Sequence, residues 1–210
     1  MTHHPLLTAA VVGLGLSGSS AAAQEFAFSC AAFPEAPSEE RLRSVFGADS
    51  VRPDSIVGSD DSPFPGSVVF EDNPEARIDV AWMDPERRSA ARWMRTRGTR
   101  WVTSQGLRVG DDLRSVEARN RWPFRLSGFV GEGGSGGRVL TWGQGQLAGP
   151  VYEGCREILT FQHGYDDTAP PDAVAQVESL SEVSSGHPAM QLINPRLVSI
   201  TLVYPPRGAR

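Results

Sequence analysis

The first 23 residues constrain this chain most strongly, because they set the compartment in which the remainder folds. Residues 6–16 are an uncharged apolar run, and the small residues 17–23 follow them and end in three alanines before Gln24. An apolar stretch of this length ahead of small residues is typical of a cleavable secretory signal. We therefore predict that residues 1–23 are a signal peptide and that residues 24–210 fold in the periplasm or outside the cell.

Two alternatives to a cleaved signal remain open on the sequence. Residues 6–16 can instead form a buried helix at the start of the fold. The chain can also be a lipoprotein acylated on Cys30, although Gln24 and Glu25 separate the apolar run from that cysteine. Beyond residue 23 no segment approaches the roughly 20 apolar residues that a membrane-spanning helix needs, so we expect no transmembrane segment after signal removal.

The chain contains two cysteines, Cys30 and Cys155, and both follow the predicted signal. In an oxidising compartment such a pair forms a disulfide by default. Closing a loop of this length contributes on the order of 4 to 5 kcal/mol in the chain-entropy model. We expect no metal site, because two cysteines need further ligands and the nearest histidine, His163, lies eight positions beyond Cys155.

All 20 basic residues are arginine, and the chain contains no lysine. The formal net charge is −5. Chemistry that requires lysine, such as a phosphate-binding P-loop or a pyridoxal-phosphate Schiff base, is therefore excluded. Domains that bind nucleic acid are typically basic, so the acidic balance argues against a nucleic-acid partner. We expect no cofactor.

Two short helices can be placed from their capping residues. The first covers residues 39–46, with Ser38 as its N-cap and Gly47 as its stop. The second begins at Asp111 or Asp112. Alternating or bulky β-formers predict strands over residues 67–70, 77–82, 90–96, 100–103, 138–142, 157–162 and 197–204. The pattern predicts an α+β fold in which short helices pack on an antiparallel β-sheet.

A short internal match bears on the domain organisation. Residues 41–45 and 112–116 share Leu-Arg-Ser-Val, and each match lies in a predicted helix that precedes predicted strands. Residues 24–210 are predicted to form a single domain, and the match adds the alternative of two related helix-plus-strands halves that divide near residues 98–105. Residues 47–66 are predicted to be loop or irregular edge structure, and residues 163–195 are predicted to be loop apart from a helix over residues 172–180.

One stretch of the second half carries a recognisable signature: residues 106–110, Leu113, Val116, Asn120, 123–124, Leu126, 128–129 and 139–142. This stretch resembles a group of uncharacterised exported bacterial proteins. More remotely, its helix entry and strands look like the modules of outer-membrane assembly lipoproteins of the BamE/SmpA type and of the β-lactamase inhibitor proteins. The likeness implies protein binding through the face of a sheet, without catalysis.

A possible catalytic motif competes with this interpretation. Residues 133–137 match the nucleophile-elbow pattern G-x-S-x-G around Ser135, and Asp166 or Asp167 and then His187 follow in the order of a hydrolase triad. An elbow must lead from a strand into a helix, whereas a predicted strand follows Ser135, so a glycine-rich turn explains the pattern better. A secreted hydrolase that uses Ser135 or His187 remains the alternative function.

Exposed aromatic residues are the other candidate site. Trp122, Phe129 and Trp142 are predicted to lie on a surface that binds a partner, with Trp122 the most exposed because Arg121 and Pro123 flank it. The sequence thus favours a non-enzymatic exported protein that binds another envelope or extracellular protein, or a surface component.

Overall fold

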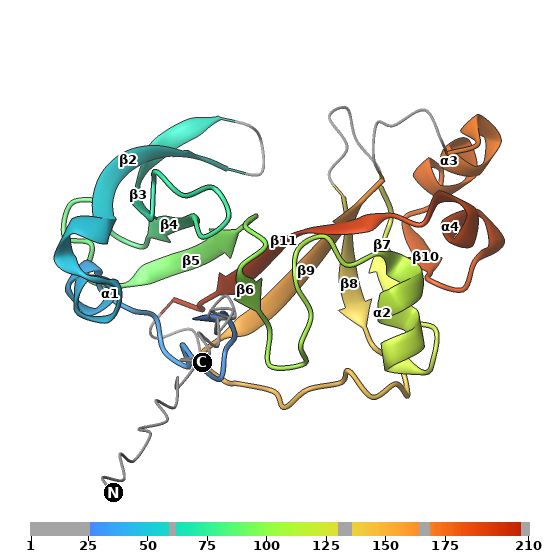
Figure 1. Ribbon diagram of the computed structural model, residues 1–210, viewed down its shortest axis with the longest axis horizontal. Helices are drawn as coiled ribbons and strands as arrows, with labels where there is room; N and C mark the ends of the chain where they lie inside the picture. Colours follow the sequence, from blue (N-terminus) through green and yellow to red (C-terminus); the bar gives the residue numbers. More distant parts are fainter. Residues whose placement is uncertain (1–25, 59–61, 130–135, 164–168, 207–210) are drawn as a thin grey trace, which may run out of the picture.

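Nine of the strands form one antiparallel sheet, in the order β10-β7-β8-β9-β11-β5-β4-β3-β2 (Figure 1). The computed structural model describes residues 26–58, 62–129, 136–163 and 169–206. Two further strands, β1 and β6, pair in parallel with each other. The strands are β1 (Phe26–Ala27), β2 (Val51–Val57), β3 (Pro63–Val69), β4 (Ile78–Trp82), β5 (Ala91–Thr96), β6 (Trp101–Val102), β7 (Arg125–Ser127), β8 (Gly137–Thr141), β9 (Arg156–Gln162), β10 (Glu182–Ser184) and β11 (Arg196–Val203).

The helices are short, and together with the sheet they confirm the predicted α+β class. They are α1 (Glu39–Phe46), the 3-10 turn η1 (Ala48–Ser50), α2 (Leu113–Asn120), α3 (Pro171–Glu178) and α4 (Pro188–Ile193). Ser38 caps α1 by accepting a hydrogen bond from the amide of Arg41, and Gly47 ends it with a φ of 95°. Asp112 caps α2 in the same way, by accepting from the amide of Ser115. No helix in the described ranges is long and apolar enough to cross a membrane.

Apart from β10, which pairs with β7 at one edge, the sheet consists of two four-stranded meanders that meet through their last strands. In the first, α1 precedes β2, β3, β4 and β5; in the second, α2 precedes β7, β8, β9 and β11. The two meanders join where β5 and β11 pair, with Met94 opposite Leu202 and Thr96 opposite Ile200. Figure 1 shows α1 beside the first meander and α2, α3 and α4 beside the second.

The helix positions that correspond in the structure are offset by about one helical turn from those that the internal sequence match aligns. Leu42 and Val116 are each the fourth residue after a capped start, and both are fully buried. The shared Leu-Arg-Ser-Val instead aligns Leu42 with Leu113, which is the first residue of its helix. The sequence match therefore does not pair the positions that correspond in the two halves.

One core cluster extends along a single face of the sheet. In the central strands Met94, Leu159 and Leu202 point into it, and the helices add buried side chains such as Leu42 and Val116. Helices α3 and α4 contribute to the same cluster. Because all four helices pack on this cluster, no helix of the described part of the chain covers the opposite face of the central strands.

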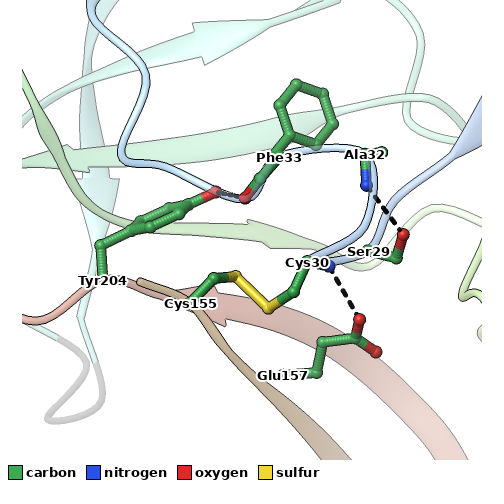
Figure 2. Close-up of a disulfide and its surroundings, with 7 residues drawn as sticks. All are labelled: Ser29, Cys30, Ala32, Phe33, Cys155, Glu157 and Tyr204. Atoms are coloured by element: carbon green, nitrogen blue, oxygen red, sulfur yellow. Dashed lines mark hydrogen bonds between the residues drawn. A yellow bond between two sulfur atoms is a disulfide. The ribbon is translucent and has the colours of Figure 1, made fainter. Parts of the chain in front are cut away.

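The N-terminal segment is fastened to the sheet by the predicted disulfide, which is confirmed (Figure 2). Cys30 and Cys155 are bonded, with their Cα atoms 5.5 Å apart. The amide of Cys30 donates to a carboxylate oxygen of Glu157 at 2.8 Å, and the Tyr204 hydroxyl donates to the carbonyl of Phe33 at 3.3 Å. These ties fix the turn that leads from β1 toward α1.

Of the two alternatives predicted for residues 47–66, loop is wrong and edge structure is nearer to the finding, because the edge strand β2 and most of β3 lie there. Pro53 is tolerated because β2 is the edge strand of the sheet. Pro63 and Pro65 are tolerated because β3 pairs with β4 only from Ser67 onward, so these prolines lie where β3 has a neighbour on one side. The residues of this segment are typical of turns, yet the segment forms most of a β-hairpin.

The strands predicted over residues 90–96 and 100–103 are present as β5 and β6, but they are not neighbours: β5 lies between β4 and β11, while β6 pairs with β1. Within residues 163–195 the predicted helix is present as α3, but β10 and α4 also interrupt the expected loop. Both missed elements are short, and each is held by partners distant in the sequence.

Gly128 offers a test of how closely β7 approaches the segment before β10. A Cβ atom at Gly128 would lie 1.6 Å from the carbonyl oxygen of Leu180, and the Gly128 amide donates to Ser181 at 2.7 Å. We expect Gly128→Ala to lower the free energy of unfolding by about 1 to 3 kcal/mol in urea titrations, because backbone must move. Gly186→Ala is the matched control, because its φ lies outside the left-handed region and the nearest atoms to a Cβ there are side-chain atoms at 3.3 Å or more. Equal losses in the two variants would contradict the close approach.

Candidate functional site

The uncovered face of the central strands is the candidate site. Alternation along each strand sends one set of side chains into the core and the next set outward. In β11, Ile200 and Leu202 are buried whereas Thr201 and Val203 are half-exposed. We call the outward set the outer face: Trp93, Arg95, Thr201, Val203, Arg156, Ile158, Thr160 and Arg138.

Strand pairing arranges the outer face in rows. Trp93, Val203 and Arg156 lie side by side on β5, β11 and β9. The next row contains Arg95, Thr201 and Ile158. Thr160 and Arg138 then pair between β9 and β8. The rows place apolar and hydroxyl side chains at the centre and guanidinium groups around them.

Trp93 is held in a fixed position by its neighbours. Its ring lies 6.0 Å from the ring of Phe64 in an edge-on arrangement. Both rings pack against a second, small cluster of buried side chains: Ile56, Val68 and Ala81. The guanidinium of Arg95 covers the Trp93 ring, with Cζ 4.9 Å from its centroid, which is a cation–π contact. Trp93 is thus a rigid aromatic residue with one part of its ring at the surface.

A nearly buried carboxylate organises the arginines beside Trp93. Asp79 projects from β4 and lies 2.9 Å from Arg77, 3.3 Å from Arg97 and 3.6 Å from Arg95. Arg95 also donates to the carbonyl of Val57, at the end of β2. This network fastens the β2–β3 hairpin to the centre of the sheet and leaves Arg95 engaged within the protein.

Arg138 and Arg156 differ from these arginines. Both side chains are exposed, and neither makes an ion pair with any residue in the described ranges. The outward positions of β5, β11, β9 and β8 that form the outer face include no Asp or Glu. The outer face is therefore basic, although the whole chain is acidic.

The structure separates the three aromatic residues that the sequence assigned to a surface. Trp122 is 52% exposed, as predicted. Trp142 is half-buried and lies 5.0 Å from the ring of Phe124. Phe129 is buried, so its assignment to a surface is wrong. Its ring packs against Gly137, where a Cβ atom would lie 2.8 Å from it.

Asn120, at the end of α2, explains why this aromatic region is rigid. Its amide nitrogen donates to the carbonyls of Trp122 at 2.6 Å and Trp142 at 3.0 Å. Its amide oxygen accepts from the backbone of Leu147 at 3.0 Å. The region is a structural junction from which Trp122 projects, and a single exposed apolar side chain is ordinary for a protein surface.

The residues of the hydrolase alternative are only partly described. Ser135, Asp166 and Asp167 lie outside the described residues. His187 is the N-cap of α4, where its Nδ1 accepts a hydrogen bond from the amide of Ala189 at 3.2 Å. His163 lies 3.5 Å from Glu178. Among the residues that the structure covers, no group of three or more His, Cys, Asp or Glu side chains is placed to hold a metal ion.

A groove of about 710 Å³ lies on the other side of the molecule's core, beside the N-terminal segment. Its walls include the rings of Phe26, Phe33 and Phe46, with Trp101 beneath them. Trp101 is buried and its indole nitrogen donates to the carbonyl of Ala76 at 2.8 Å. Polar and charged residues complete the lining, among them Ser38, Glu35 and Arg41, and one residue of each charge does not point to a particular ligand.

Glu157, beside the disulfide, carries a prediction for pH dependence. Burial raises the pKa of its carboxyl above the ordinary value of 4.5, against the lowering effect of the hydrogen bond from the Cys30 amide. As the pH rises past 4.5 the unfolded chain loses this proton more readily than the folded chain, so stability falls. We expect Glu157→Gln, which keeps an acceptor for Cys30, to gain stability over the wild type between pH 4 and pH 7 in urea titrations. A stability difference that is the same at both pH values would contradict the buried carboxyl.

No protein-family model, no curated protein and no solved structure matches this chain. Sequence reasoning missed the outer face because strand alternation separates the two sides of a strand but does not say which side the helices cover. Its apolar members lie in the predicted strands over residues 90–96, 157–162 and 197–204.

Proposed function

We propose that this chain is an exported, non-enzymatic protein that binds another protein of the envelope or the extracellular space through its outer face. The observation that carries the proposal is the outer face itself, an uncovered sheet surface in which Trp93, Val203 and Ile158 are partly exposed beside free arginines. Tryptophan and arginine are the residues most enriched at the energetic centres of protein interfaces.

The rigidity of the outer face supports the same proposal. A binding surface that is already ordered loses little conformational entropy when a partner docks. Trp93 is fixed by Phe64 and Arg95, and Arg95 is fixed in turn by Asp79. An open sheet face with fixed side chains also suits a protein surface better than a small molecule, which binds in a concave pocket.

Export is supported by the disulfide and by the absence of a membrane-spanning helix among the described residues. We propose that residues 1–23 are removed and that the mature chain resides in the periplasm or is secreted. Mass spectrometry of the protein from fractionated cells should give a chain that begins at Gln24, outside the cytoplasmic fraction. A full-length chain that begins at Met1 in the cytoplasm would contradict export.

Site-specific photo-crosslinking tests binding through the outer face. A benzophenone amino acid would replace Thr201, at the centre of the outer face, or Gln176, which is exposed on α3. We expect one protein to crosslink at Thr201 in intact cells, with none at Gln176. Crosslinks at Gln176 alone, or the same products from both positions, would overturn the proposal.

A further inference from the structure

We infer that the partner binds the outer face through an acidic surface of its own. Carboxylates of that surface bind Arg138 and Arg156, which lie beside an apolar centre. The inference rests on the proposed function and names the chemistry of its partner. The first observation is that charge is unevenly distributed between the outer face and the rest of the chain. The chain has 25 acidic and 20 basic residues, whereas the outer face contains three arginines; Asp79 of the adjacent strand β4 pairs with Arg95, and Arg138 and Arg156 are left without a carboxylate among the described residues.

The state of the arginines carries the argument further. Several described arginines make ion pairs, such as Arg43 and Arg88 with Glu39 and Arg119 with Asp111, whereas exposed Arg41, Arg92 and Arg121 make none with a described residue. Arg138 and Arg156 also make no ion pair with a described residue, and they differ from those three in lying beside the apolar side chains of the outer face. Their guanidinium groups are free to make the two parallel hydrogen bonds that a carboxylate accepts.

The placement of the two arginines defines the geometry of the partner. Arg156 lies next to Val203, in the row that begins with Trp93. Arg138 lies next to Thr160, beyond Ile158 along β9. The partner must therefore cover the partly exposed Trp93, Val203 and Ile158 and present carboxylates along one side of them. Such a combination of an apolar centre and a charged rim is typical of protein interfaces.

Other polyanions fit these observations less well. Nucleic acids are bound by stripes or patches of many basic groups, whereas this chain is acidic overall and the outer face has two free guanidinium groups. Anionic membranes similarly attract clusters of basic residues. An acidic protein surface uses both the apolar rows and the two arginines, so it is the occupant that the outer face favours.

The decisive experiment uses the protein that crosslinks at Thr201, once it is identified and purified. Binding would be measured by calorimetry for the wild type, for Arg138→Gln with Arg156→Gln, and for the control Arg41→Gln, an exposed arginine on α1. We expect the double variant to bind at least about tenfold more weakly, with its melting temperature unchanged, and the control to bind like the wild type. Raising the salt from about 50 to about 300 mM should weaken the wild type more than the double variant.

The outcomes separate this inference from the proposed function. If the protein crosslinks at Thr201 but the double variant binds as tightly as the wild type, the acidic partner is wrong and the outer-face interface stands. If no protein crosslinks at Thr201, the proposed function fails first. Phosphatidylglycerol vesicles and a duplex DNA are tested as alternative ligands. If the wild type binds either of them and the double variant does not, the proposal of an acidic protein partner is overturned.

Discussion

Replacing Cys30 and Cys155 together by serine should lower the free energy of unfolding by about 4 to 5 kcal/mol, because the disulfide closes a loop of 125 residues. The expected fall in melting temperature is about 10 °C or more for a chain of this size. The loss arises mainly in the unfolded chain, which gains conformational freedom when the link is removed. Urea titrations of the oxidised wild type and the double variant measure it.

Reduction provides the control for this prediction. A thiol reductant should shift the unfolding midpoint of the wild type toward that of the double variant and leave the double variant unchanged. Denatured, non-reduced protein should contain no titratable thiol, since the described cysteines are paired. Two thiols in that titration, or equal midpoints for the oxidised wild type and the double variant, would contradict the disulfide.

Asn120→Ala should cost about 3 kcal/mol of unfolding free energy, the second-largest effect that we expect. Asn120 is fully buried, and its side chain satisfies the carbonyls of Trp122 and Trp142 and the amide of Leu147. Removing one partner of a buried hydrogen bond leaves the other group unsatisfied, which costs about 1 kcal/mol or more for each bond. Urea titration gives the loss, and tryptophan emission should shift because Trp122 and Trp142 are released.

Two variants control the Asn120 prediction. Ala118→Ser lies on the exposed side of the same helix and should change stability by less than about 0.5 kcal/mol. Asn120→Asp keeps the acceptor for Leu147 but turns both donors into acceptors facing carbonyls. It should therefore destabilise the protein at least as much as the alanine variant. Wild-type stability in either Asn120 variant would refute the role of this side chain.

The elements that the sequence predicted well are those whose signals are local. Helix α1 begins after Ser38 and ends before Gly47 because both ends are set by residues next to them. Strand β11 was located within one residue at each end because β-branched residues and leucine dominate it, although a register shift between Leu197 and Ser199 interrupts the alternation. The disulfide followed from having two cysteines in a chain predicted to be exported.

The elements that were missed depend on partners far away in the sequence. β1 and β6 are two residues each and pair across about 75 positions, so neither has a local signature. The prolines of β3 suggested loop because their effect depends on where β4 begins to pair. Phe129 was expected at a surface, but Gly137 lets its ring enter the core. The candidate site belongs to this group, because the outer face exists only once the helices have taken the other side.

Radical footprinting of the complex tests the central claim most directly, because the chain contains its own control. Trp93 lies on the outer face, whereas Trp122 is 52% exposed at the end of α2. When the protein is bound to the partner captured at Thr201, oxidation of Trp93 should fall strongly and oxidation of Trp122 should stay as in the free protein. Protection of Trp122 with unchanged oxidation of Trp93 would contradict the outer face as the binding site.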